Sequence, residues 1–122
     1  MAYEVTIHAI SVPASGDLSA KQFYFGTINA SGQVAVTGAA AYADGVIGDK
    51  PAAADRPCSL YTTPGQVVKV MCGAAVSNGD LIEADASGKA VTRAAGKILA
   101  KALAAGSGDG AIIPALLILE RT

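Results

Sequence analysis

The feature that most constrains the fold of this chain is a turn motif that occurs twice. Asn29–Gly32 reads Asn-Ala-Ser-Gly, and Asp85–Gly88 reads Asp-Ala-Ser-Gly about 56 residues later. In each copy, the first residue can accept a local hydrogen bond and the glycine can adopt the positive φ angle that ends such a turn. Alternating apolar residues follow at Val34–Thr37 and at Ala90–Thr92, which is the period of a β-strand. The repeat therefore predicts a duplicated β unit.

Composition limits the class of protein. A chain of 122 residues fits one domain with a real core, and 52% hydrophobic but only 5% aromatic residues indicate a core of Ala, Val, Ile and Leu. Nine basic and ten acidic residues are scattered without a basic stripe, which disfavours nucleic acid as a partner. The longest apolar run, residues 111–119, is far shorter than the roughly 20 residues of a membrane-spanning helix. We expect no membrane partner and no classical export signal.

The N-terminal segment has two interpretations. Tyr3, Val5 and Ile7 alternate with polar residues as in a half-buried strand, and Pro13 ends the pattern. Residues 1–15 are then either an ordinary first strand or an extended arm that adds to the sheet edge of a neighbouring subunit. Residues 16–122 are predicted to form a single β domain, with pseudo-repeats of about 16–73 and 74–122.

Further along the chain, the repeat decides between strand and helix. Residues 93–105 are rich in Ala, Leu and Lys and have high helix propensity, but the matching part of the first repeat contains two prolines. We therefore predict a strand in Lys97–Leu103, with Ile98-Leu99 matching Val46-Ile47. The nearly continuous apolar run Ile112–Leu119 predicts a strand buried on both faces, and its Pro114 predicts a bulge or an edge position.

The sequence offers no set of residues for catalysis. His8 is the one histidine, and with Cys58 and Cys72 it supplies too few close-spaced ligands for a zinc site. The glycine-rich Gly106–Gly110 lacks the Gly-Lys-Ser/Thr ending of a phosphate-binding loop and is better explained as a hairpin turn. We expect two free, buried thiols, no catalytic, cofactor or metal site, and no enzymatic activity.

Three segments carry a family resemblance: Asn78–Val91, Ile98–Leu103, and Gly108–Gly110 before the apolar C-terminal strand. Asp44–Gly48 matches a small-residue segment of the same family in the first repeat. With these motifs the chain resembles the capsid decoration, or cement, proteins of tailed bacteriophages. Its Pro- and Ala-rich connection Lys50–Pro57 departs from that family.

The resemblance implies an all-β fold, a small β-barrel or β-tulip built from two pseudo-repeated units with little or no helix. It also implies a structural virion protein, assembled in the host cytoplasm, that binds the outer surface of an assembled capsid and stabilises the shell. The partners would be the lattice of the major capsid protein and two further copies of the chain in a homotrimer. The alternative is a soluble, non-catalytic β-type binding module associated with a tail or with carbohydrate.

Function should lie in the parts outside the repeat, namely the N-terminal segment and the Lys50–Pro57 loop. The residues expected to contact the capsid or a neighbouring subunit are Tyr3, Val5, Ile7, Ile10, Val12, Lys50, Pro51 and Arg56.

Overall fold

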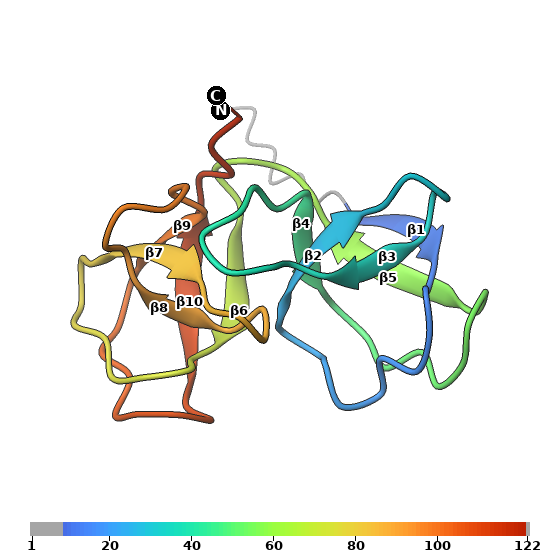
Figure 1. Ribbon diagram of the computed structural model, residues 1–122. Helices are drawn as coiled ribbons and strands as arrows, with labels where there is room; N and C mark the ends of the chain where they lie inside the picture. The colour runs from blue at the N-terminus through green and yellow to red at the C-terminus, as the bar shows by residue number, and fades with distance from the viewer. Residues whose placement is uncertain (1–8, 122) are drawn as a thin grey trace, which may run out of the picture.

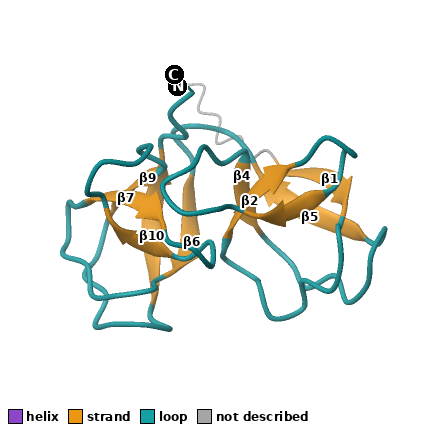
Figure 2. Ribbon diagram, viewed as in Figure 1, coloured by secondary structure: helices purple, strands orange, loops and turns teal. Residues whose placement is uncertain are grey.

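The computed structural model describes residues 9–121. Within them the chain forms ten strands joined by turns and loops, with no helix (Figure 2). The predicted all-β class is confirmed. The strands are β1 (Ala9–Pro13), β2 (Phe25–Ile28), β3 (Val34–Val36), β4 (Gly45–Ile47), β5 (Pro57–Tyr61), β6 (Val67–Met71), β7 (Leu81–Ala84), β8 (Ala90–Thr92), β9 (Ala100–Ala102) and β10 (Ile112–Leu117).

The strands form two antiparallel sheets with the same topology, placed side by side (Figure 1). The first has the order β1-β5-β4-β2-β3 and the second β6-β10-β9-β7-β8. Register is repeated as well, since Gly26 pairs with Val36 in the first sheet as Ile82 pairs with Thr92 in the second. We call β1–β5 the first unit and β6–β10 the second unit. Residues in matching places of the two sheets are called equivalent.

The duplicated turn is structurally identical in the two units. Asn29 Oδ1 accepts hydrogen bonds from the amides of Ser31 (2.9 Å) and Gln33 (3.0 Å). Asp85 Oδ1 accepts them from Ser87 (2.8 Å) and Lys89 (2.9 Å). The turns end at glycines with positive φ angles, as the motif predicts. Each turn fixes the register of the hairpin that it closes.

Each sheet curls until its two edge strands meet at one point. A single parallel bridge joins Ala14, just after β1, to Val34 in β3, and another joins Cys72, just after β6, to Ala90 in β8. No continuous ladder runs between these edges in the described residues, so each unit is a strongly curled sheet without full barrel closure. Each unit therefore keeps one gap, between its first strand and its copy of the duplicated turn.

The stretch with the highest helix propensity contains β9, so the strand predicted from the repeat is confirmed. The predicted match of Ile98-Leu99 to Val46-Ile47, however, is three residues out of place. Val46 and Ile47 pair with Tyr61 and Leu60 of β5. In the second sheet, Lys101 and Ala102 pair with the equivalent residues of β10, Leu116 and Ala115. Ile98-Leu99 lie in the connection before β9, residues 93–99, which is one residue shorter than residues 37–44 of the first unit. The 56-residue spacing of the two turns would match Val46 to Ala102, one residue from its observed equivalent Lys101.

Two predictions for the last strand are wrong. Burial alternates along β10, with Ile113, Ala115 and Leu117 inside, so only one face of the strand is buried. Pro114 lies in a strand flanked by β6 and β9 rather than at an edge.

The position of Pro114 explains why a proline is tolerated there. Its carbonyl accepts the Leu103 amide at 3.0 Å, just beyond the end of β9. The nitrogen and the carbonyl of a residue in an antiparallel strand face the same neighbour, so the missing N–H points past the end of the ladder. In the first unit the equivalent Ser59 keeps this N–H and donates it to Asp49 Oδ1 at 3.0 Å.

The buried side chains form two clusters. One fills the first unit around Ile47 and Leu60, and the other fills the second unit around Ile82 and Leu117. Cys58 belongs to the first cluster and Cys72 to the second, and both are free and buried as predicted. The second cluster also includes Phe25, Ala43 and Val46 of the first unit, so apolar packing continues from one unit into the other.

Candidate interaction surface

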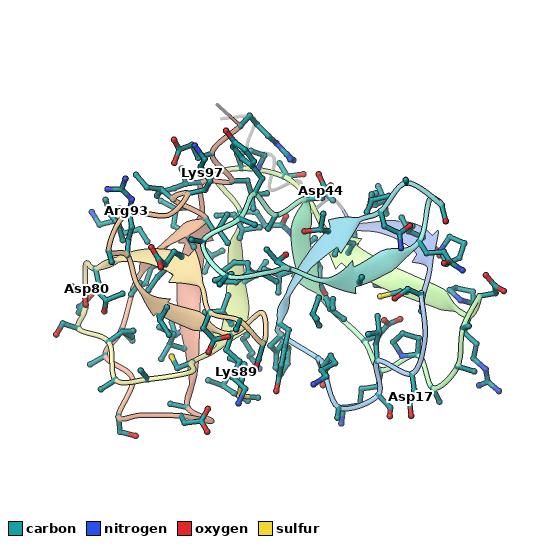
Figure 3. The ribbon with its side chains drawn as sticks, in the orientation of Figure 1. Asp17, Asp44, Asp80, Lys89, Arg93 and Lys97 are labelled. Atoms are coloured by element: carbon teal, nitrogen blue, oxygen red, sulfur yellow. The ribbon has the colours of Figure 1, made fainter. Side chains whose placement is uncertain are left out.

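The described residues contain no group of three or more His, Cys, Asp or Glu side chains that could hold a metal ion. The charged side chains labelled in Figure 3 lie at separate places around the molecule and do not converge on one point. Glu83 and Lys89 have shifted pKa values that come from structural hydrogen bonds. Backbone hydrogen bonds from Gly96 and Ala94 lower the pKa of Glu83, and a hydrogen bond from Lys89 to Asp109 raises the pKa of that lysine. In residues 9–121 no helix is long and apolar enough to cross a membrane.

The two units meet at an apolar junction. Phe25 and Val46 lie on the outer face of the first sheet, and both are 0% exposed because they pack into the core of the second unit. Two backbone hydrogen bonds frame this contact. The Phe25 amide donates to Gly88 O at 2.8 Å, and the Met71 amide donates to Phe23 O at 3.0 Å. Residues 23–25 therefore fill the gap between β6 and the turn that ends at Gly88.

Two glycines allow the backbones to approach closely at this junction. A Cβ atom on Gly88 would lie 3.2 Å from Val36 Cβ, and one on Gly96 would lie 2.6 Å from Ala40 Cβ. The Ala40 amide donates to Ala84 O at 2.9 Å beside them. Larger side chains at either glycine would push the two units apart.

Phe23 is strained and lies at the edge of the junction. Its φ angle is 73°, whereas the equivalent Gly79 has φ 90° at no steric cost. Both residues donate the equivalent hydrogen bond, from Phe23 to Ile47 O and from Gly79 to Ala102 O. A non-glycine residue in this conformation costs roughly 1–2 kcal/mol. The surrounding contacts hold Phe23 in place.

Two hollows flank Phe23. One, of about 260 Å³, is lined also by Lys50, Met71 and Ile112, and the other, of about 280 Å³, also by Tyr61 and Gln66. The Gln66 side chain is buried, and neither polar atom of its amide has a hydrogen-bond partner among residues 9–121. These hollows are shallow features at the margin of the junction.

The outer face of the second sheet carries exposed apolar side chains. In the first sheet the equivalent face is partly covered by the second unit. Here the described residues leave Leu81 and Leu103 exposed, whereas Val67 and Ile112 are exposed but border the hollows beside Phe23. Exposed apolar side chains spread over one face of the sheet make this face a candidate interaction surface. Its exposed members are Val67, Leu81, Leu103 and Ile112.

The residues expected from the sequence to make contacts fall into separate places. Tyr3, Val5 and Ile7 lie outside the described residues. Ile10 and Val12 belong to β1, which is an edge strand, and Ile10 is exposed while Val12 packs against the first core.

The other three expected residues do not form one surface. Arg56 is exposed beside β1, and its carbonyl accepts the Ala14 amide at 2.9 Å. Lys50 lies away from β1, in the hollow next to Phe23. Pro51 is buried, and its carbonyl accepts the Leu18 amide at 2.8 Å, so its role in the described structure is to anchor a loop.

Sequence reasoning missed the outer face of the second sheet. One signal could have found it: the repeat makes Leu81 equivalent to Phe25 and Leu116 equivalent to Tyr61, so the apolar face is duplicated.

No protein-family model matches the sequence, and no curated protein matches it. A solved structure is similar. The crystal structure of the head fiber gp8.5 N base in bacteriophage phi29 superimposes with a TM-score of 0.71, covering 96% of this chain and 98% of that one at 12% identity. This chain shares the fold of that phage protein. The narrower resemblance to capsid decoration proteins stays a prediction.

Proposed function

We propose that this chain is a structural protein of a tailed-phage virion that binds the outer surface of the assembled capsid and stabilises the shell. The observation that carries the proposal is the similarity to the phi29 head fiber base over nearly the full length of both chains. The sequence resemblance to capsid decoration proteins agrees with it independently. On this proposal the chain has no enzymatic activity and assembles on the capsid in the host cytoplasm as a homotrimer.

The surface chemistry supports a role in binding a lattice. Exposed apolar residues on the second sheet and scattered charges suit a protein that occupies a seam between larger subunits. Each copy needs only a modest contact area, because copies that also contact one another bind a repetitive lattice with avidity.

A second candidate is suggested by the same neighbour. The chain could serve as the base that attaches a longer fibre to the head, since the neighbour is described as the base of a head fiber. A fibre base must bind the shell but need not stabilise it. The two functions are therefore separated by shell stability.

The test is co-sedimentation of the purified chain with empty capsid shells of the phage that encodes it, in unexpanded and expanded states. Binding together with a higher melting temperature of the shell supports a decoration protein, and binding without that increase supports a fibre base. Glycans and small ligands serve as competitors for the alternative of a soluble binding module. If the chain pellets with neither form of the shell, the proposal fails.

A further inference from the structure

Because the two units are repeats, each contact surface at their junction exists twice, but the chain uses each only once. The surface that inserts belongs to the first unit and comprises Phe25, Val46 and Tyr61, which we call the inserting face. The surface that receives it belongs to the second unit and is the gap between β6 and the Asp85–Gly88 turn, which we call the receiving gap. The second unit has its own inserting face, and the first unit has its own receiving gap.

The receiving gap of the first unit is empty among the described residues. In the second unit the side chains beside the occupied gap are buried, with Val68 8% and Ala84 1% exposed. The equivalent Ile10 is 42% exposed, and Ile28 is only half-buried. The first unit thus leaves apolar surface exposed, whereas the equivalent surface of the second unit is covered.

The glycines at the ends of the two turns differ in the same way. A Cβ on Gly88 would contact Phe25 O and Val36 Cβ of the first unit at 3.2 Å. A Cβ on the equivalent Gly32 would meet nothing within 4 Å. Phe25 fills the space beside Gly88, whereas the equivalent space beside Gly32 is open.

The inserting face of the second unit is also uncovered. Phe25 and Val46 are 0% exposed, but the equivalent Leu81 is 38% exposed and Lys101 is exposed. Leu116 and the equivalent Tyr61 are both half-buried, so the difference between the two faces lies at the other two positions. The long stem of Lys101 can pack on apolar surface while its ammonium group stays in water at the rim.

The two uncovered surfaces lie at opposite ends of the molecule, with β7 on the left and β1 on the right of Figure 1. One chain cannot bring its own Leu81 to its own Ile10 without unfolding. A second chain can bring its Leu81 there.

We propose that a second copy of this chain inserts its Leu81 face into the receiving gap of the first unit, so that copies associate head to tail. The contact repeats the junction within the chain, with the Leu81 amide donating to Gly32 O as Phe25 donates to Gly88 O. Pro13, equivalent to Met71, has no N–H, so one of the two backbone bonds is not repeated and the contact is weaker than the internal one. A head-to-tail contact closes into a ring when its rotation permits. The inference rests on the proposed oligomer and names its surfaces.

The test uses the free chain without capsid shells, so its failure is distinguishable from failure of capsid binding. Sedimentation equilibrium is expected to show concentration-dependent association of the unmodified chain. Leu81→Glu and Ile10→Glu are each expected to weaken it by about tenfold or more, which is about 1.4 kcal/mol or more. Ile112→Glu is the control for an added charge on the same sheet, because the equivalent Pro57 is exposed outside the junction. Since Ile112 itself borders the hollow beside Phe23, urea denaturation must show that this variant keeps the internal junction. Circular dichroism confirms that each variant is folded.

Mixing the two variants gives the sharper result. The Leu81→Glu chain keeps an intact receiving gap and the Ile10→Glu chain keeps an intact inserting face, so the mixture is expected to form a heterodimer and nothing larger. A chain that stays monomeric at the highest concentration reached overturns the proposal. It is also overturned if the mixture gives no heterodimer, or if only Leu81→Glu has an effect, which would mean that another segment, such as residues 1–8, fills the gap.

Discussion

Phe25 and Leu81 occupy equivalent places in the two sheets, but Phe25 is 0% exposed and Leu81 is 38% exposed. The difference arises because the second unit covers Phe25 and no described residue covers Leu81 in the same way. The two residues therefore form a matched pair in which one holds the molecule together and the other is available for a partner.

Phe25→Ala is expected to lower the free energy of unfolding by about 3–5 kcal/mol, because it leaves a cavity where the two cores meet. Leu81→Ala is expected to change it by less than about 1 kcal/mol in the monomer. Urea denaturation at a protein concentration too low for association measures both. Equal losses for the two variants would contradict the asymmetry of the junction.

Asp85→Ala is expected to lower the free energy of unfolding by about 1–2 kcal/mol, because the amides of Ser87 and Lys89 lose their acceptor. Asp85→Asn is the control, since Asn29 performs the same task in the first unit. Thermal denaturation of both variants separates the hydrogen bonds from the charge. A stable alanine variant would mean that the turn does not depend on its side-chain acceptor.

Glu83 is expected to make stability depend on acid pH. Its carboxylate accepts the amides of Ala94 (2.9 Å) and Gly96 (2.8 Å), which lower its pKa in the folded chain. A lowered pKa stabilises the fold above the ordinary carboxyl range, and this stability is lost as pH falls through the folded value. Glu83→Gln keeps an acceptor oxygen without titrating, so its unfolding free energy should fall less steeply below about pH 4.5. Parallel acid profiles for the two proteins would refute the assignment.

The thiol of Cys58 is expected to be unreactive in the native chain. Burial, followed by the nearby Asp49 carboxylate, raises its pKa from 9.0 to about 11, and burial also raises the pKa of Cys72. Because the folded chain holds the Cys58 proton more tightly than the unfolded chain, stability should decrease as pH rises from about 9 to about 11. An aromatic disulfide reagent at pH 8 should react slowly with the native protein and at once with two thiols in denaturant. Rapid reaction of the native chain would show that the thiols are accessible.

The sequence predicted the all-β class and a duplicated β unit because the turn motif encodes its own geometry, through Asn29 and Asp85 and their glycines. The boundaries differ: β1 belongs to the first unit rather than lying outside the repeat, and the second unit begins at β6, before residue 74. It also predicted β9 correctly against helix propensity, because tertiary pairing overrides local preference. It misplaced the match to Val46-Ile47 because Ile98-Leu99 is a similar apolar pair, whereas the residues in the equivalent place are Lys101-Ala102. The position of Pro114 could not be foreseen, since it depends on where β9 ends.

The candidate site was only partly predictable. The strand that contains Ile10 and Val12 was recognised by the alternation before it and its early break, but contact of these residues with a partner stays a prediction. The Leu81 face was missed because an apolar strand residue looks the same in a sequence whether or not another unit covers it. Pro51 was expected to contact the capsid or a neighbouring subunit, but it is buried, and its carbonyl accepts the Leu18 amide.

The central claim is that the chain is a structural protein on the outside of a phage capsid. Electron cryo-microscopy of shells incubated with the purified chain, compared with bare shells, tests it most directly. The account predicts added density on the outer surface at regular lattice positions, into which the two five-stranded units fit side by side. Shells that show no added outer density at saturating chain would contradict it.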